Sequence, residues 1–262
     1  MSAVSDSTHV VLIHGTWGNG DSLSDARREF EKRGHTVHTP TLRFHDLPLE
    51  EGADKIASLS VRDYADDVAA LVDSLKSPPL IVGHSLGGLV AQLVAARTRH
   101  AGVVAATPAP AAGVFATYPG TLRIFGGHYL RWRPWTKPLY PCSWKVFRRY
   151  ITNTTDEATA REKYAELVCD SGRVYCEMAF WFLDREKATR LDFTAVTGPV
   201  LAIGGRHDRT VDRRVARATA ARYARGSYLE IPDSDHLVFH GNALPVTMAR
   251  IDEWMAQQQI FA

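Results

Sequence analysis

The sequence predicts an α/β fold in which helices cover both faces of a mostly parallel β-sheet. Short apolar segments rich in β-branched residues alternate along the chain with segments whose apolar residues recur at helical spacing, as in parallel sheets. The chain has 262 residues, of which 45% are hydrophobic, and this size suits one large domain with an insertion better than two independent domains. The alternation is interrupted between about residues 113 and 191 and then resumes.

The predicted elements follow one another in a regular order. Strands are expected at Val10–Ile13, Thr36–His38, Leu80–Val82, Val103–Ala106, Val200–Ile203 and Tyr228–Ile231. Helices are expected at Ser22–Lys32, Val61–Leu75, Gly88–Arg97, Arg213–Arg222 and Leu244–Gln257. Gly34 ends the first helix, and Pro78 and Pro79 stop the second.

Residues 113–191 are interpreted as a helical cap inserted into an α/β core that comprises residues 1–112 and 192–262. The insertion holds several helical stretches, few strand signals and four of the six tryptophans of the chain, Trp132, Trp135, Trp144 and Trp181. Its aromatic side chains either form the cap's own small core or line a substrate pocket, and the sequence leaves both interpretations open. The stretch HYLRWRPWTKPLYPCSWKVFRRY adds six Arg and Lys residues, a pattern that fits an anionic substrate, a lipid surface or a solvated face.

The charge and cysteine content exclude several function classes. The net charge is +2, with 31 Lys and Arg against 29 Asp and Glu, so there is no electrostatic reason to expect nucleic acid as a partner. Three cysteines fit a reducing compartment better than a disulfide framework, although a Cys169–Cys176 pair stays open. The start MSAVSDSTHV has neither region of a signal peptide, and no stretch is long enough to span a bilayer. We therefore expect a soluble, cytoplasmic protein without a stable membrane anchor.

A serine lies between two glycines at the junction of a predicted strand and a predicted helix. The segment Gly83-His84-Ser85-Leu86-Gly87 matches the pattern G-x-S-x-G in the place where a nucleophile elbow must lie. In such a tight turn the glycines avoid clashes, and the serine hydroxyl projects above the sheet from a strained backbone. The simpler alternative is a helix N-cap serine after a glycine turn. The motif and its context together predict Ser85 as a nucleophile.

A serine hydroxyl needs a general base, and an acid must orient that base. Asp208 follows the strand 200–203 in GGRHDRTV, and His236 follows the strand 228–231 in PDSDHLVFH. The carboxyl ends of parallel strands meet at one edge of a sheet, and the chain order Ser, acid, His suits this arrangement. We therefore expect His236 to accept the serine proton and Asp208 to hold its Nδ1–H. The alternative bases are His207 and His240, and the alternative acids are Asp212, Asp233 and Asp235.

Acyl transfer also needs N–H donors for the negative charge that develops on the carbonyl oxygen. Leu86 follows the nucleophile at the start of a helix, so its N–H is one expected donor. The second is expected from the loop HGTWGNG, with the N–H of Thr16 as first choice and that of Trp17 as second. The side chains of Trp17 and His84 are expected to contact substrate, whereas His14 is expected to pack beneath the site.

Four segments together resemble the α/β-hydrolase superfamily: VVLIHGTWGNG, LIVGHSLGGLV, LAIGGRHDRTV and IPDSDHLVF, in family order and at family-like spacing. The resemblance covers nearly the whole chain, with 113–191 in the place of the variable cap. It is strongest to the branch that contains plant methyl esterases, hydroxynitrile lyases and many bacterial esterases. It implies an α/β-hydrolase fold with an eight-stranded, mostly parallel sheet, the triad Ser85–Asp208–His236, oxyanion N–H groups from Thr16 and Leu86, and no metal or organic cofactor.

Two departures from this branch bear on the reaction. Its lyases carry a threonine after the first-loop histidine and a lysine after the catalytic histidine, where this sequence has Gly15 and Leu237. Without that lysine, cyanide-releasing chemistry is disfavoured. Haloalkane dehalogenases and epoxide hydrolases of this fold resemble each other in using an aspartate nucleophile, so the serine at position 85 disfavours both.

The expected function is therefore cleavage of a carboxylic ester or lactone of a small hydrophobic substrate by a serine hydrolase. Two alternatives stay open on the sequence alone. The same fold and residues also suit carbon–carbon bond cleavage or perhydrolysis, and slow receptors that hold a ligand with little turnover exist on this fold. Fold alone does not decide among these functions.

Overall fold

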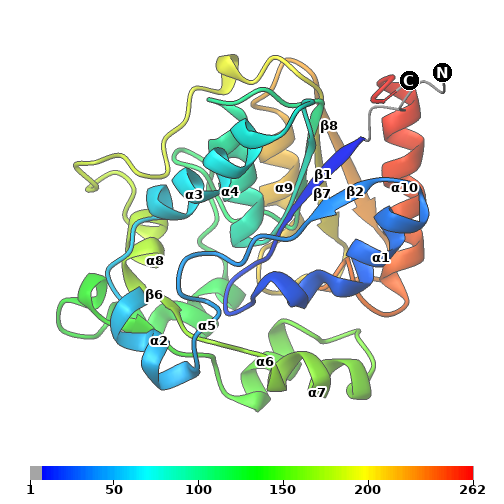
Figure 1. Cartoon of the computed structure of the whole chain (residues 1–262). Coiled ribbons are helices and arrows are strands. Elements are labelled where there is room, and N and C mark those ends of the chain that lie inside the picture. Colours follow the sequence, from blue (N-terminus) through cyan, green and yellow to red (C-terminus); the bar gives the residue numbers. More distant parts are fainter. Residues whose placement is uncertain (1–7, 262) are drawn as a thin grey trace.

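The computed structural model describes residues 8–261, which form a parallel sheet between two layers of helices (Figure 1). The sheet has six strands in the order β2-β1-β3-β4-β7-β8, and every neighbouring pair is parallel. Its strands are β1 (His9–Ile13), β2 (Thr36–His38), β3 (Leu80–His84), β4 (Gly102–Ala106), β7 (Val200–Gly205) and β8 (Gly226–Ile231). These are the six strands predicted from the sequence, and the expected α/β class with a mostly parallel sheet is confirmed.

The expectation of eight strands is not met. Within residues 8–261 the large sheet has six strands, because the chain between β2 and β3 forms the helices α2 (Leu49–Ile56) and α3 (Val61–Ser74) and no strand. The other two strands, β5 (Pro138–Leu139) and β6 (Asp170–Ser171), pair with each other as a separate antiparallel ribbon.

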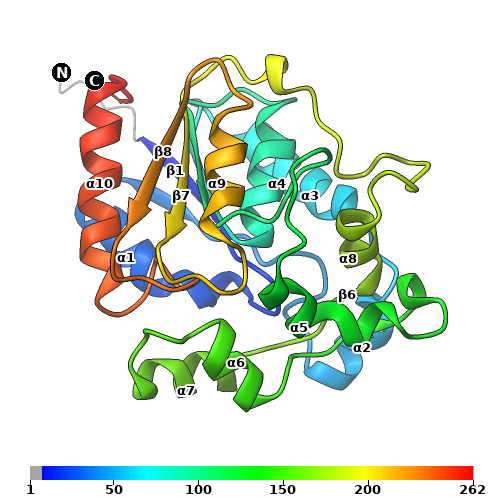
Figure 2. The same cartoon turned by 180° about the vertical axis from the view of Figure 1, so that it is seen from behind.

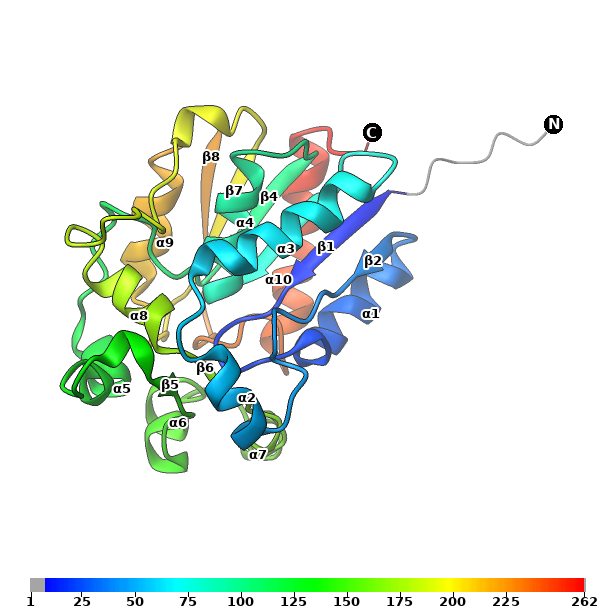
Figure 3. The same ribbon diagram turned by 60° about the vertical axis from the view of Figure 1, so that its left-hand side comes forward.

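The helices divide between the two faces of the sheet according to the alternation of strand side chains. Val11 and Ile13 of β1 face the layer of α3 and α4 (Leu86–Ala95), whereas Val10 and Leu12 face α1 (Ser24–Lys32) and α10 (Ala243–Gln257). The helix α9 (Arg213–Ala220) packs on β7 and β8, and Figure 3 shows it on the same side as α3 and α4. This alternation is the period-two pattern of a strand that is buried on both faces.

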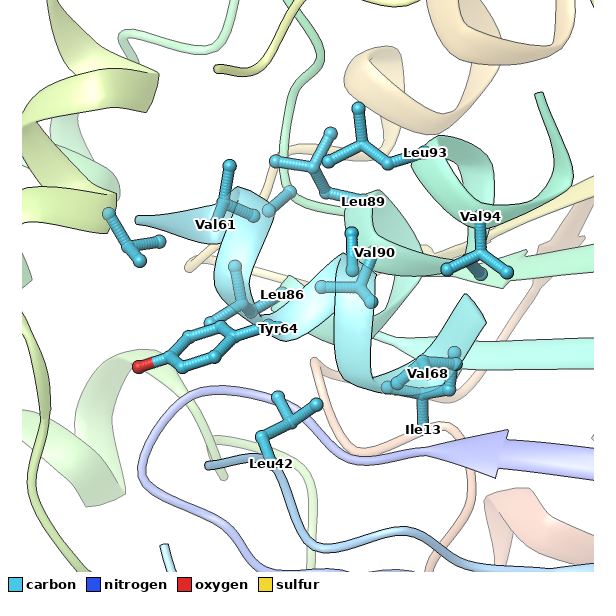
Figure 4. Packing of buried hydrophobic residues seen from close by; sticks show 14 of the residues in the cluster. Ile13, Leu42, Val61, Tyr64, Val68, Leu86, Leu89, Val90, Leu93 and Val94 are labelled. Carbon is cyan, nitrogen blue, oxygen red and sulfur yellow. The ribbon is translucent and has the colours of Figure 1, made fainter. Parts of the chain in front are cut away.

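The packing of α3 and α4 against β1 fixes the position of the turn that carries Ser85. Tyr64 and Val68 of α3 interlock with Leu86 and Val90 of α4 over Ile13, all of them buried (Figure 4). The capping box of Ser60 with the N3 residue fixes where α3 begins. The start of α4 is therefore held in a dense apolar layer, and it begins at Leu86, two residues earlier than predicted.

Residues 113–191 contain most of the helices that are not part of the sheet layers. They are α5 (Pro119–Tyr129), α6 (Trp144–Tyr150), α7 (Glu157–Ala165) and α8 (Gly172–Ala179), with the short turn η2 (Pro134–Thr136). In Figure 2 the arrowheads of β7 and β8 point towards α5, α6 and α7. The segment thus lies beyond the carboxyl ends of the strands, where the site residues are expected; the domain division itself stays a prediction.

Two further expectations bear on the environment of the chain. Cys142, Cys169 and Cys176 are all free thiols, so the possible Cys169–Cys176 pair is not formed. In the part of the chain that the structure describes, every helix is too short or too polar to cross a bilayer.

Candidate active site

Ser85 occupies a strained turn between β3 and α4. Its φ of 53° and ψ of −118° lie in a region that side-chain-bearing residues rarely adopt. A Cβ on Gly83 would lie 2.0 Å from the carbonyl oxygen of Gly87, and a Cβ on Gly87 would lie 2.3 Å from that of Ile13. Neither distance is tolerable, so both positions of the motif require glycine, and an ordinary N-cap does not impose such a requirement. Ser85 also makes no side-chain cap hydrogen bond.

The structure brings the side chains of Ser85, His236 and Asp208 together in one chain of hydrogen bonds. The Nε2 atom of His236 lies 2.9 Å from the Oγ of Ser85, and its Nδ1 lies 2.8 Å from the Oδ2 of Asp208. All three side chains are buried. Because a carboxylate only accepts, Nδ1–H donates to Asp208, and this tautomer leaves Nε2 free to accept the serine proton.

Asp208 is oriented by the backbone that follows it. Its Oδ1 accepts the N–H groups of Thr210 at 2.8 Å and Val211 at 3.0 Å, which leaves Oδ2 for the imidazole. The loop after β7 therefore sets the position of the carboxylate independently of His236.

The alternative bases do not reach the serine. His240 lies on the wall of the same cavity, but its Nδ1 faces the Oδ2 of Asp25 at 3.8 Å. The side chain of His207 is exposed to solvent, and the backbone N–H of His207 donates to the carbonyl of Ser234. Within residues 8–261, the imidazole hydrogen-bonded to Ser85 is that of His236.

The alternative acids are engaged elsewhere or exposed. Asp212 caps α9 and pairs with Arg214, and Asp233 is exposed. The buried carboxylate of Asp235 accepts the N–H groups of Thr154 at 2.7 Å and Thr155 at 2.8 Å. It also accepts the N–H of Leu237 at 3.0 Å, so it ties the loop of His236 to the segment between α6 and α7.

The imidazole of His84 is directed towards the backbone of His236. Its Nε2 donates to the carbonyl oxygen of His236 at 2.8 Å, and the hydroxyl of Thr107 donates to the same oxygen at 3.3 Å. Burial, together with the nearby imidazole of His236, holds the pKa of His84 well below its usual value of 6.5. His84 is therefore a neutral donor that supports the loop of His236, although one side of it borders the cavity.

His14 supports the first loop from below. Its Nδ1 donates to the carbonyl of Gly15 at 2.9 Å, and its Nε2 accepts the N–H of Leu42 at 3.0 Å. Burial and the neighbouring His45 lower the pKa of His14 to about 3. The fixed neutral tautomer holds the loop that carries Thr16.

The two predicted donors of the first loop differ in availability. The N–H of Trp17 donates to the Oδ2 of Asp170 at 3.3 Å and is therefore occupied. In residues 8–261 the N–H of Thr16 has no hydrogen-bond acceptor, and Leu86 opens α4, so its N–H has no acceptor within the helix. The indole of Trp17 donates to the carbonyl of Leu139 at 3.0 Å while one face lines the cavity.

Two residues of the site were missed in the sequence. Asp170 is fully buried, and its Oδ1 accepts the hydroxyl of Tyr64 at 3.2 Å while Oδ2 holds the N–H of Trp17. The hydroxyl of Tyr175 is hydrogen-bonded to that of Thr16. Asp170 is one of 29 acidic residues and Tyr175 one of nine tyrosines, and no local pattern distinguishes either from the others.

A cavity of about 560 Å³ opens beside Ser85 and His236. Its wall is mostly apolar and comes largely from the segment 113–191, including Phe115, Leu122, Phe125, Tyr129, Phe147, Ile151, Leu167, Tyr175, Met178, Phe180, Trp181 and Phe182. A volume of this size holds a drug-sized ligand. Among the described residues there is no cluster of three His, Cys, Asp or Glu side chains placed to hold a metal ion.

Comparisons with known sequences show one family match and one similar hydrolase. The sequence model of the "Alpha/beta hydrolase family" matches residues 10–247. A pyrethroid hydrolase of Sphingobium wenxiniae is 31% identical over 81 residues, which cover 31% of this chain and 28% of that relative's length.

Solved structures resemble nearly the whole fold. A methylesterase from Arabidopsis superposes with a TM-score of 0.70 at 14% identity, covering 95% of this chain and 99% of that one. A thermophilic esterase from Thermogutta terrifontis superposes with a TM-score of 0.69 at 18% identity, covering 97% of this chain and 91% of that one. At such low identity these similarities concern the fold alone.

Proposed function

The chain belongs to the alpha/beta hydrolase family, and on that premise we propose that it is a serine hydrolase acting on a carboxylic ester or lactone. The observation that carries the proposal is the hydrogen-bonded series Ser85–His236–Asp208 at the edge of an apolar cavity. The names of the relatives, which include a pyrethroid hydrolase and two esterases, support the same class of reaction.

In the proposed reaction the Oγ of Ser85 attacks the carbonyl carbon while its proton passes to the Nε2 of His236. Asp208 keeps the imidazole oriented and stabilises the imidazolium that forms. The free N–H groups of Thr16 and Leu86 stabilise the negative charge on the carbonyl oxygen. The imidazolium returns its proton to the departing alcohol, which leaves Ser85 acylated. Water activated by His236 then attacks the acyl group and releases the acid and the free serine.

The apolar cavity wall favours a hydrophobic substrate, and we infer that residues 113–191 act as the cap that selects it. Leu237, which follows the base, also lines the cavity. This apolar side chain supplies no positive charge for a leaving cyanide, so its place supports hydrolysis over cyanohydrin cleavage. The cytoplasmic location remains a prediction from the sequence.

The test compares the wild-type protein with Ser85→Ala on p-nitrophenyl esters from acetate to palmitate and on a panel of lactones. We expect turnover that disappears in Ser85→Ala, and a chain-length optimum that reports the depth of the cavity. Ser143→Ala is the matched control, because this exposed serine makes no side-chain cap bond to α6 and should leave turnover unchanged. Full activity of the Ser85→Ala protein would contradict the proposal.

A second pair of variants assigns the acid. Asp208→Asn changes the hydrogen-bond pattern of the imidazole, so we expect kcat to fall by roughly 10³- to 10⁴-fold. Asp233→Asn removes an exposed alternative carboxylate close to His236 in the chain and should leave kcat unchanged. The reverse result would transfer the orienting role from Asp208 to Asp233.

A further inference from the structure

Large apolar side chains are exposed on one side of the molecule, between the end of α5 and the end of α8. Leu130 is 90% exposed and Trp132 is 84% exposed, and Phe182 and Leu183 are 65% and 71% exposed. The two groups are neighbours, because the rings of Tyr129 and Phe180 lie 5.5 Å apart. Figures 1 and 2 show the loop that follows α5 and the loop that follows α8 projecting from this side. Contiguous exposed apolar surface of this kind marks an interaction site more often than a solvated face.

The segment from α5 to α6 carries positive charges only. From Ser74 to Thr155 the sequence contains no Asp or Glu. From α5 onwards this stretch carries seven cations, namely Arg123, Arg131, Arg133, Lys137, Lys145, Arg148 and Arg149, and none of them forms an ion pair among the described residues. Positive charge is therefore concentrated in this segment of the sequence, although the whole chain carries only +2, and Arg131, Arg133 and Lys137 lie in the loop 130–137 itself.

Carboxylates of two elements lie near this region: those of the 181–190 segment, and those of α2, which packs on β5 and exposes Glu50, Glu51 and Asp54. Glu186 pairs with Arg173, and Asp184 accepts the N–H groups of Glu186 and Ala188 within its own loop. Among the described residues, none of these carboxylates forms an ion pair with Arg131, Arg133 or Lys137, since Glu186 pairs with Arg173 and Glu51 with Lys55.

The loop 130–137 presents its apolar side chains from an ordered backbone. The carbonyl of Arg133 accepts both the N–H and the hydroxyl of Thr136, and the N–H of Lys137 donates to the carbonyl of Pro134, which is buried. Leu130 and Trp132 are exposed just before this turn and alternate along the chain with the cations Arg131 and Arg133. Apolar tips flanked by cations match the interface of an anionic bilayer, where tryptophan rings and leucines enter and arginines meet phosphates.

We propose that this surface, Leu130–Lys137 together with Phe182 and Leu183, docks the protein reversibly on an anionic lipid bilayer. The cavity opens beside it, because the partly exposed Leu122 and Phe182 both line the cavity. Docking would therefore turn the cavity mouth towards the membrane, where hydrophobic molecules concentrate. The inference goes beyond the proposed hydrolysis and does not depend on it.

Two other occupants fit the surface less well. A nucleic acid would pair with the arginines but would leave Leu130 and Leu183 in water, since phosphate contacts dominate such binding. A second copy of the chain would bring the same unpaired cations together across a symmetric contact, with like charges facing each other.

The test is cosedimentation of the full chain with vesicles of phosphatidylcholine alone and of phosphatidylcholine with phosphatidylglycerol, at low and high salt. We expect binding to the anionic vesicles that is at least about tenfold tighter than to the zwitterionic ones and that weakens as salt rises. Leu130→Ser/Trp132→Ser and Arg131→Gln/Arg133→Gln should each reduce the partition coefficient by about tenfold or more. The tryptophan emission should shift to shorter wavelength on binding, and the shift should be lost in Trp132→Ser.

Matched controls lie at the other end and side of the molecule. Lys76→Gln/Arg99→Gln removes two exposed cations that precede β3 and β4, and Val246→Ser removes an exposed apolar group of α10. Both should bind vesicles like the wild type. Absence of vesicle binding by the folded protein would overturn the proposal, as would equal binding by the loop variants. Equal affinity for a DNA duplex would identify a general polyanion patch instead, and a dimer lost in Leu130→Ser/Trp132→Ser without vesicle binding would identify an interface between copies.

Discussion

The imidazole of His84 donates a hydrogen bond to the backbone carbonyl of His236, with 2.8 Å between Nε2 and the oxygen. His84 directly precedes Ser85, so this bond links the turn that carries the proposed nucleophile to the loop that carries the proposed base. Thr107, in the loop after β4, donates to the same carbonyl. The end of β3 and the loops after β4 and β8 therefore meet at the carbonyl oxygen of His236. The distance between Ser85 and the imidazole of His236 depends on these hydrogen bonds.

We expect His84→Ala to lower kcat by roughly 10- to 100-fold, because a small displacement of a base costs this much, while KM changes little. His84→Gln should recover much of the loss, since an amide N–H reaches the same carbonyl. Steady-state kinetics on the best ester of the panel measures both constants. A raised KM with unchanged kcat would instead support the sequence-based expectation that His84 contacts substrate.

The second prediction concerns the glycines of the elbow. A Cβ on Gly87 would lie 2.3 Å from the carbonyl oxygen of Ile13, so β1 and α4 must separate to admit it. We expect Gly87→Ala to lower the free energy of unfolding by about 1–3 kcal/mol or more, and to reduce activity as Ser85 moves. Urea denaturation measures the first effect.

Gly126 is the matched control for this change. It lies within α5, and a Cβ there meets nothing within 4 Å. Gly126→Ala should raise the free energy of unfolding by about 0.5–1 kcal/mol, since alanine restricts the unfolded chain and favours helix. Equal effects at the two positions would contradict the steric account of the elbow.

The third prediction is a loss of stability in mild acid. The pKa of His14 falls to about 3 in the fold from its ordinary 6.5, and burial also lowers that of His84. Below pH 6.5 these histidines therefore bind protons in the unfolded chain but not in the folded chain. Stability should fall as pH drops from 6.5 towards 3, by about 1.4 kcal/mol per pH unit for His14.

The measurement is the free energy of unfolding by urea at several pH values, for the wild type and for His14→Gln. Glutamine offers a donor for Gly15 and an acceptor for Leu42 but does not titrate in this range. The free energy of unfolding of His14→Gln should therefore change less with pH than that of the wild type, and the difference should equal the contribution of one histidine. Parallel profiles would exclude His14 as a source of acid sensitivity.

The sequence allowed correct prediction of those parts of the fold that are set by local pattern. The six strands and the elbow are examples, because β-branched runs and the glycines around Ser85 act through neighbours a few residues away. The helix α2 was missed, since Gly52 lies in its middle and its apolar face is short. The expected eight strands came from the resemblance, whereas the local pattern indicated only the six strands that the sheet contains within residues 8–261.

The contacts that support the site could not be predicted from the local sequence pattern. The bond from the N–H of Trp17 to Asp170 joins residues 153 positions apart, and that from His84 to His236 joins residues 152 apart. Asp235 was considered only as an alternative acid, yet its carboxylate accepts backbone N–H groups from residues 154 and 155. The chain order of Ser85, Asp208 and His236 was predictable because parallel strands bring their carboxyl ends together, whereas no comparable rule exists for buried supporting carboxylates.

The last prediction concerns the hydroxyl groups of Thr16 and Tyr175, which are hydrogen-bonded to each other on the cavity wall. Two hydroxyls carry two hydrogens, and their mutual bond uses one. A phenol is the stronger donor and an aliphatic hydroxyl the stronger acceptor, so Tyr175 donates and the hydroxyl of Thr16 keeps its hydrogen. Burial and the charge of Asp170 hold the pKa of Tyr175 well above its usual range, which keeps this donor protonated.

Thr16 lines the same cavity as Ser85, and because its N–H is a proposed oxyanion donor, we infer that its hydroxyl reaches the same developing charge. We expect Thr16→Val to lower kcat by about tenfold or more with little change in KM, and Thr16→Ser to restore activity. Tyr175→Phe should act through the same hydroxyl, so the double variant Thr16→Val/Tyr175→Phe should be no slower than Thr16→Val. Losses that add, or that fall on KM alone, would show that Tyr175 serves in packing against Phe125, whose ring lies 4.6 Å away, and that the pair donates nothing to the transition state.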